Sequence, residues 1–236
     1  MNAATRAETP QQIEVVKTWL ADETDVHKLG NILGCLANNA ISAAKVDLAR
    51  LALARGADPN VCDARGLAPL HRAARGYGVA APAFVALLLA AAGINVNLRD
   101  LFFALPFAIA IDGLIYCVPD NPRPENFQLA TMLLRAGSNV KRVRPGKSAE
   151  AHLIYCHHSR PNHLARDEPF RILLAMVRGV RAAGSWRAYE RRFHRGTLPR
   201  FRSLVVRGRA TSTDALLAAM ANLPHRPFRA VLSFGP

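Results

Sequence analysis

The stretch that decides the fold spans residues 46–74 and reads VDLARLALARGADPNVCDARGLAPLHRAA. In its first half, apolar residues recur at helical spacing between Val46 and Leu53, and Gly56 ends that helix. In its second half, Pro69 opens a new helix whose alanines allow a neighbouring helix to approach closely. The stretch therefore predicts two helices joined by a turn, which stack against further units of the same kind.

This pattern resembles the ankyrin repeat, a unit of about 33 residues whose first helix opens with Thr-Pro-Leu-His-x-Ala. The corresponding run here is Ala68-Pro69-Leu70-His71-Arg72-Ala73. Because Ala68 replaces the threonine, we expect the hydroxyl that caps the helix to be missing. The resemblance also implies that His71 is structural and bonds to backbone groups of the turn, rather than acting as a catalytic base.

Weaker copies of the unit flank this stretch, and together they predict an all-α ankyrin-repeat solenoid. We expect an ankyrin-repeat domain at residues 1–184, with units at approximately 10–29, 30–62, 63–99, 100–145 and 146–184. In the first unit, Thr9, Pro10 and Gln12 predict a capping box at the start of a helix. In the second unit, a first helix is expected around Leu36–Ile41.

The repeat spacing is irregular, and the repeats stop near Gly184. Closing turns at Ala57, Ile94 and Ser138 are 37 and 44 residues apart, so we expect loop insertions at residues 77–82 and 120–125, which are rich in Pro and Asn. Residues 185–236 are predicted to form a basic C-terminal helical cap, because a terminal repeat without one would leave its apolar flank in water.

The net charge of +14 lies entirely in the last part of the chain. Residues 1–140 carry 12 basic and 12 acidic side chains, whereas residues 141–236 carry 19 basic and 5 acidic ones. This asymmetry favours an acidic partner, either nucleic acid, an anionic lipid surface or an acidic protein face. An arginine-rich coding bias, with 26 Arg against 5 Lys, explains the same numbers equally well.

An amphipathic helix is expected at the start of the cap. Trp186, Tyr189 and Phe193 fall on one side of it, and the other side carries four arginines, Arg187, Arg191, Arg192 and Arg195. A solvated cap face is the favoured interpretation, because runs of charge are usually solvated. The alternative is an anion-binding module that uses these arginines on nucleic acid or on an acidic membrane surface.

Catalytic motifs are missing from the sequence. It has no glycine-rich phosphate loop, no Gly-x-Ser-x-Gly elbow and no His-Glu-x-x-His helix, so we expect neither enzyme activity nor a cofactor. The residues best suited to bind a metal are His152, Cys156, His157, His158 and His163. We interpret them as a stacking face with a polar edge and predict no metal site. The four cysteines form no Cys-x-x-Cys pair and are interpreted as reduced and buried.

Two apolar runs, residues 76–98 and 101–118, are long enough for a membrane hairpin. Pro82 and Gly93 interrupt the first run and Asp112 the second, so stacked buried helices explain both better, and we expect no transmembrane segment. The first twenty residues carry four charges and lack the layout of a secretory signal. We therefore expect an intracellular protein, in the cytoplasm rather than the nucleus.

The resemblance to ankyrin repeats implies a non-catalytic scaffold that binds another protein on the concave surface formed by the turn tips and first helices. The positions that it places toward a partner are Arg65, Arg99, Lys141, Arg142 and Arg144 at the tips, and Arg72 and Arg75 on the adjoining helix. We expect a monomer whose partner is a protein, with nucleic acid as the alternative.

Overall fold

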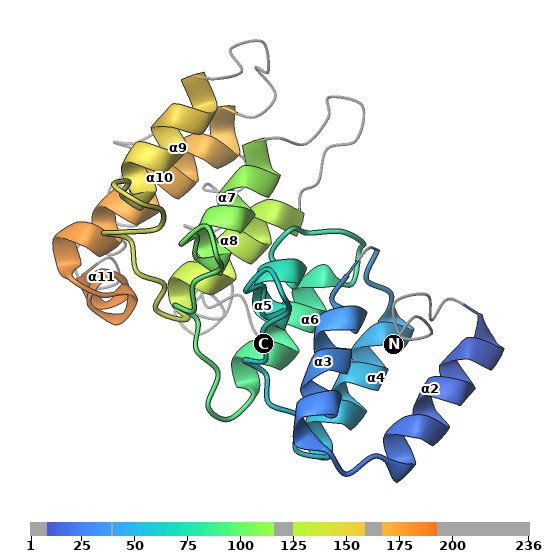
Figure 1. Cartoon of the computed structure of the whole chain (residues 1–236). Coiled ribbons are helices and arrows are strands. Elements are labelled where there is room, and N and C mark those ends of the chain that lie inside the picture. The colour runs from blue at the N-terminus through green and yellow to red at the C-terminus, as the bar shows by residue number, and fades with distance from the viewer. Residues whose placement is uncertain (1–8, 39, 116–124, 159–166, 193–236) are drawn as a thin grey trace. The chain divides into compact units, whose positions relative to one another are not determined.

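The computed structural model describes residues 9–38, 40–115, 125–158 and 167–192. The regular elements within these residues are helices, as predicted (Figure 1). They are α2 (Pro10–Asp22), α3 (Val26–Leu36), α4 (Ala43–Ala54), α5 (Pro69–Ala73), α6 (Ala81–Ala90), α7 (Pro106–Ile115), α8 (Glu125–Arg135), α9 (Ala149–His158), α10 (Asp167–Ala183) and α11 (Trp186–Arg192). The chain divides into two compact units, residues 1–181 and residues 182–236.

Within the first unit, the helices stack in two rows (Figure 1). The first helices of successive pairs pack on one another in the order α3, α5, α7 and α9, and the second helices do so in the order α4, α6 and α8. Helix α2 packs against α4, at the place of a second helix from a preceding pair. This is the helix-turn-helix stacking that the sequence pattern of residues 46–74 predicts.

The core of the first unit lies between the two rows. Leu48 on α4, Leu70 on α5 and Phe107 on α7 are almost fully excluded from solvent. Ala49 and Ala73 are fully buried as well, which confirms that small side chains lie where helices meet. Burial of apolar area is the main term that stabilises such a stack, because each unit alone cannot cover its own apolar face.

The start of α2 confirms the predicted capping box. The backbone N–H of Gln12 donates to the Thr9 hydroxyl at 3.3 Å, and the backbone N–H of Thr9 donates to the Gln12 side chain at 3.3 Å. Pro10 occupies the first turn, where its missing N–H has no intrahelical acceptor. The sequence signal is therefore realised at atomic level.

The expected first helix around Leu36–Ile41 is wrong. Asp25 begins α3 much earlier, because its carboxylate accepts the N–H groups of His27 at 2.9 Å and Lys28 at 3.2 Å, and the helix ends at Leu36. The chain then turns instead of continuing the helix, and the side chain of Lys45, which is fully buried, holds this turn. The ammonium of Lys45 donates to the carbonyl of Ala40 at 2.9 Å.

The insertions and cysteines differ in part from expectation. Residues 77–80 form the first inserted loop, but α6 already begins at Ala81, and of residues 120–125 only Glu125 lies within the described residues.

Cys156 is buried, whereas Cys35 is half-buried and Cys62 is exposed, so the expectation of buried thiols is wrong for Cys62. Cys117 lies outside the described residues.

Asparagine side chains connect the turns of successive units. Asn60 accepts the N–H of Asn95 at 2.8 Å and donates to the carbonyl of Gly93 at 2.9 Å. One unit later, Asn97 accepts the N–H of Asn139 at 2.7 Å and donates to the carbonyl of Gly137 at 3.3 Å. The same two bonds thus recur between consecutive pairs of turns and connect each turn to the next.

Across the described ranges of the chain, no helix combines the length and the apolar character that a bilayer crossing requires.

Candidate functional site

The loop before α7 presents three consecutive apolar side chains to solvent. Leu101, Phe102 and Phe103 are 65%, 72% and 62% exposed, although side chains of this size usually lie in the core. Phe103 adopts a φ of +55°, a left-handed conformation that is strained for a residue other than glycine. The backbone therefore holds these side chains outward at an energetic cost.

A buried aspartate gives this loop its shape. One carboxylate oxygen of Asp100 accepts the N–H groups of Phe102 at 2.9 Å and Ala104 at 2.8 Å, and the Asp100 carbonyl accepts the N–H of Phe103 at 2.9 Å. A loop with this many internal bonds loses little conformational entropy when a partner binds. Its three apolar side chains are therefore preorganised for contact.

Neighbouring turns are bonded to the same loop. The N–H of Leu101 donates to the carbonyl of Arg65 at 3.2 Å. The guanidinium of Arg99 donates to the carbonyl of Phe103 at 2.6 Å and to that of Arg142 at 2.9 Å. The turn at residues 63–67, the loop at residues 98–104 and the turn at residues 141–147 consequently form one connected surface.

The predicted partner-binding residues differ in how they are placed. Arg65, Arg75, Lys141 and Arg142 are exposed. Arg99 is half-buried and its guanidinium is engaged by the two backbone carbonyls described above, so it acts as a brace between loops.

The other two predicted arginines are in ion pairs, Arg72 with Asp63 and Arg144 with Asp112. Burial alone would raise the pKa of Asp63, but the N–H groups of Leu67 and Arg65 and the Arg72 guanidinium outweigh it and lower that pKa. The carboxylate therefore stays ionised at neutral pH and keeps Arg72 against the turn.

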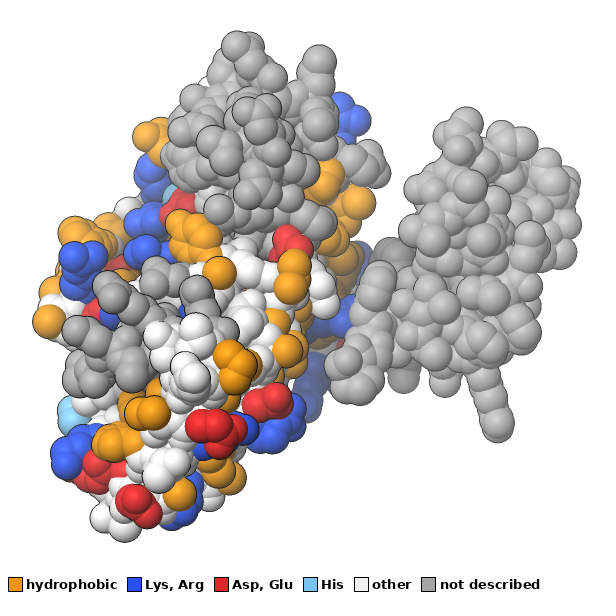
Figure 2. Space-filling view, turned by 90° about the vertical axis from the view of Figure 1, so that its right-hand side faces the viewer, with side chains coloured by type: hydrophobic (Ala, Val, Ile, Leu, Met, Phe, Trp, Pro, Cys, Tyr) orange, Lys and Arg blue, Asp and Glu red, His pale blue; other side chains and the backbone are white. Residues whose placement is uncertain are grey.

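Charges of both signs are mixed on the part of the surface that Figure 2 shows, where basic, acidic and hydrophobic side chains are interspersed. The balanced charge of residues 1–140 predicts such a mixture. In the second unit, Arg187, Arg191 and Arg192 are exposed on α11, and Trp186 packs against Tyr189 with ring centroids 5.4 Å apart. Arg195 and Phe193 lie outside the described residues.

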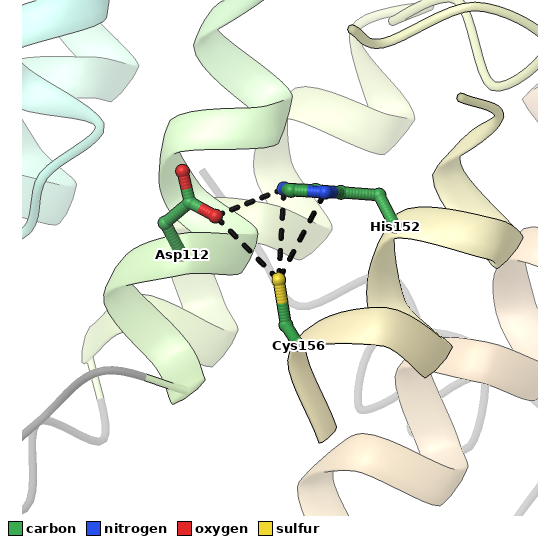
Figure 3. Close-up of side chains that lie close together, drawn as sticks. All are labelled: Asp112, His152 and Cys156. Carbon is green, nitrogen blue, oxygen red and sulfur yellow. Dashed lines mark hydrogen bonds and ion pairs between the residues drawn. The ribbon is translucent and has the colours of Figure 1, made fainter. Parts of the chain in front are cut away.

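The predicted histidine and cysteine cluster is only partly assembled. His152 and Cys156 face Asp112 of α7, a residue that was not predicted as part of the cluster (Figure 3). His157 instead stacks on Phe170 at 4.0 Å between ring centroids, and His158 bonds to the carbonyl of Ile154. His163 lies outside the described residues.

His71 has the structural role that the family resemblance implies. Its Nδ1 accepts the N–H of Ala68 at 3.2 Å, a bond from the side chain to the N-cap backbone that leaves the role of the missing threonine hydroxyl unfilled. Its Nε2 therefore carries the proton and donates to the carbonyl of Ala104 at 3.3 Å. Burial lowers the pKa of His71, and the bond to Ala104 offsets this only in part. The neutral ring thus links one unit to the next.

A comparison with protein families matches one part of the chain. Residues 65–101, which include α5 and α6 and end at Leu101 of the exposed loop, match the family model described as Ankyrin repeat. A search of curated proteins found no match. The chain therefore contains an ankyrin repeat, and the regular elements of its described residues are helices. Ankyrin repeats generally mediate protein–protein interactions.

Proposed function

We propose that this protein is a non-catalytic scaffold that binds a partner protein through its turn tips. The binding surface, here called the tip surface, consists of the apolar side chains of residues 101–103 and the basic side chains of Arg65, Lys141 and Arg142. The observation that carries the proposal is the outward display of three large apolar side chains on one braced loop. Contiguous exposed apolar residues rimmed by polar ones are typical of protein interaction sites.

The chemistry of the tip surface selects a partner segment. Phe102 and Phe103 provide aromatic area, the kind of side chain that often dominates binding energy at interfaces. The exposed cations at positions 65, 141 and 142 favour carboxylates at the rim, where they raise the association rate more than the affinity. The expected partner is therefore a protein segment that combines apolar side chains with aspartate or glutamate.

The burial of the cluster formed by Asp112, His152 and Cys156 argues against a catalytic role. Cys156 and His152 resemble a nucleophile and its base, but the Cys156 side chain is fully excluded from solvent. A thiol must reach its substrate to act as a nucleophile. The scaffold proposal therefore requires no chemistry from these residues.

Affinity capture with matched variants tests the proposal. Phe102→Ser should weaken the binding of a captured partner at least about tenfold, because truncating an aromatic side chain in an interface can cost about 2 kcal/mol of binding free energy or more. Lys141→Glu with Arg142→Glu should slow association with the same partner. Val79→Ser is the control, because Val79 is 85% exposed but lies in another loop.

The proposal is wrong if the captured protein binds wild type and both tip variants equally well. If binding instead fails only after charge reversal at positions 187, 191 and 192, and falls steeply with salt, the anion-binding alternative is correct.

A further inference from the structure

Two stacked helices bring together three side chains that the tip surface does not use. Asp112 lies on α7, and His152 and Cys156 lie one turn apart on α9, which packs against α7. An Asp112 carboxylate oxygen is 2.9 Å from His152 Nε2 and 3.7 Å from Cys156 Sγ, and Cys156 Sγ is 3.8 Å from either nitrogen of the His152 ring (Figure 3).

These separations are close to those of zinc ligands. Oxygen and nitrogen bind zinc at about 2.0–2.2 Å and sulfur at about 2.3 Å, so tetrahedral geometry places the donor atoms roughly 3.3–3.6 Å apart. The sulfur distances exceed this range slightly, and the oxygen–nitrogen distance falls slightly below it. Small side-chain rotations are sufficient to place all three atoms around one ion.

The surroundings also suit a metal ion. Cys156 is fully buried and His152 is 4% exposed, whereas the Asp112 side chain is 25% exposed and leaves a side from which an ion and one water can enter. Arg144 binds the outer oxygen of Asp112, so the inner oxygen faces the other two donors. Outer hydrogen bonds of this kind orient carboxylate ligands in metal sites.

Arg144 also opposes the site to some degree. Its Nε lies 3.4 Å from His152 Nε2, where its proton competes with a metal for the nitrogen lone pair. The Asp112 carboxylate is nevertheless fixed in place, because its outer oxygen pairs with Arg144 and its inner oxygen bonds to His152. The inner oxygen therefore stays in position between the two proposed ligands of α9.

We propose that Asp112, His152 and Cys156 form a zinc site that joins the first helices of two successive units. The carboxylate oxygen, one imidazole nitrogen and the sulfur are the protein ligands, and the fourth position takes water. On binding, the thiol releases its proton to solvent, the imidazole proton that His152 shares with Asp112 moves to the other ring nitrogen, and the ion takes the place of that hydrogen bond. The ion thus cross-links α7 and α9, a role that does not depend on the tip surface.

Titration of the full chain with Co²⁺, after removal of metal by a chelator, tests the site. We expect one equivalent to produce the absorption of tetrahedral cobalt with a thiolate charge-transfer band, and Zn²⁺ to displace it and raise the melting temperature. Cys156→Ser should abolish the thiolate band, and Asp112→Asn should weaken cobalt binding at least tenfold. Cys62→Ser is the matched control, because that exposed thiol lies outside the cluster.

Circular dichroism of each variant shows whether it folds, and Asp112→Asn remains informative if Cys156→Ser does not, because its side chain has the same shape as the original. The proposal is overturned if wild type gives no thiolate band with excess Co²⁺. It is equally overturned if folded Cys156→Ser keeps the band, or if Asp112→Asn binds Co²⁺ as tightly as wild type.

Discussion

Gly76, which follows α5, occupies a position that no larger residue fits. Its φ is +71°, and a Cβ atom there would lie 1.6 Å from a side-chain oxygen of Asn126, which is itself fully buried on α8. Gly76→Ala should therefore destabilise the fold by about 2–4 kcal/mol, since backbone strain and overpacking each cost about 1–3 kcal/mol. Urea unfolding measures this loss.

Gly93 provides the control for that prediction. Its φ is +75°, close to that of Gly76, but a Cβ atom there has no neighbour within 4 Å. Gly93→Ala should cost only the backbone strain, about 1 kcal/mol. Equal losses in the two variants would show that Asn126 moves aside without cost and that the steric argument is wrong.

Single residues differ in how well the sequence predicts their role. The structural role of His71 follows from the short run around Pro69. One of its two bonds goes to the nearby Ala68, and the other goes to Ala104, 33 residues along the chain. Asp112 and His152 are 40 residues apart, and their contact exists only because α7 and α9 stack. No spacing rule indicates such a pair, so the sequence singled out two of the three proposed ligands, His152 and Cys156, and missed both the carboxylate and the site that the three residues form.

At the scale of elements, the asparagine bonds between turns contribute to the stacking register. Asn97→Ala removes one donor and one acceptor bond to the next unit, so we expect a loss of about 1–2 kcal/mol in the free energy of unfolding. Asn97→Asp keeps the acceptor and should lose less than the alanine variant. Asn95→Ala, which removes an acceptor within its own turn, is the comparison.

The order of losses decides this prediction. If Asn97→Ala unfolds no more easily than Asn95→Ala, the bonds between units contribute nothing beyond a local turn. Thermal unfolding followed at the helical circular dichroism signal compares the three variants directly.

Helix positions were predictable where capping and periodicity agree, and less so elsewhere. The Thr9 box placed the start of α2 correctly because both partners lie within one turn. In the second repeat, the local cap at Asp25 begins the first helix about ten residues before the position that the repeat pattern predicts. Residues 101–103 are exposed, although the apolar run 101–118 to which they belong predicts a buried helix.

For the whole molecule, the location of charge matters more than its total. The tip surface lies within the first unit. Residues 1–140 carry equal numbers of basic and acidic side chains, whereas 19 of the 31 basic residues follow position 140. Lys141 and Arg142 are the first of these basic residues, and they stand beside the exposed loop. The scaffold proposal therefore uses only the beginning of the basic segment.

Global stability should fall in mild acid because His71 is held neutral between two units. Its pKa in the folded protein is below the ordinary value of 6.5, so as pH falls the unfolded chain takes up a proton before the folded one does. The contribution of His71 is complete above pH 6.5 and is lost below it, until pH reaches the lowered folded pKa. The carboxylates of Asp63 and Asp112 have lowered pKa values and act only at lower pH, below their ordinary value of 3.8.

Urea unfolding at about pH 7.5 and about pH 5.5 tests this effect, which can reach about 1.4 kcal/mol for one histidine that stays neutral in the folded state. His71→Gln should be less stable than wild type at both pH values, because the ring bonds are lost, but it should show a smaller change between them. His27→Gln, at an exposed position on α3, should keep the wild-type change. If His71→Gln loses as much stability between the two pH values as wild type does, another group is responsible and His71 is not the acid-sensitive link between the units.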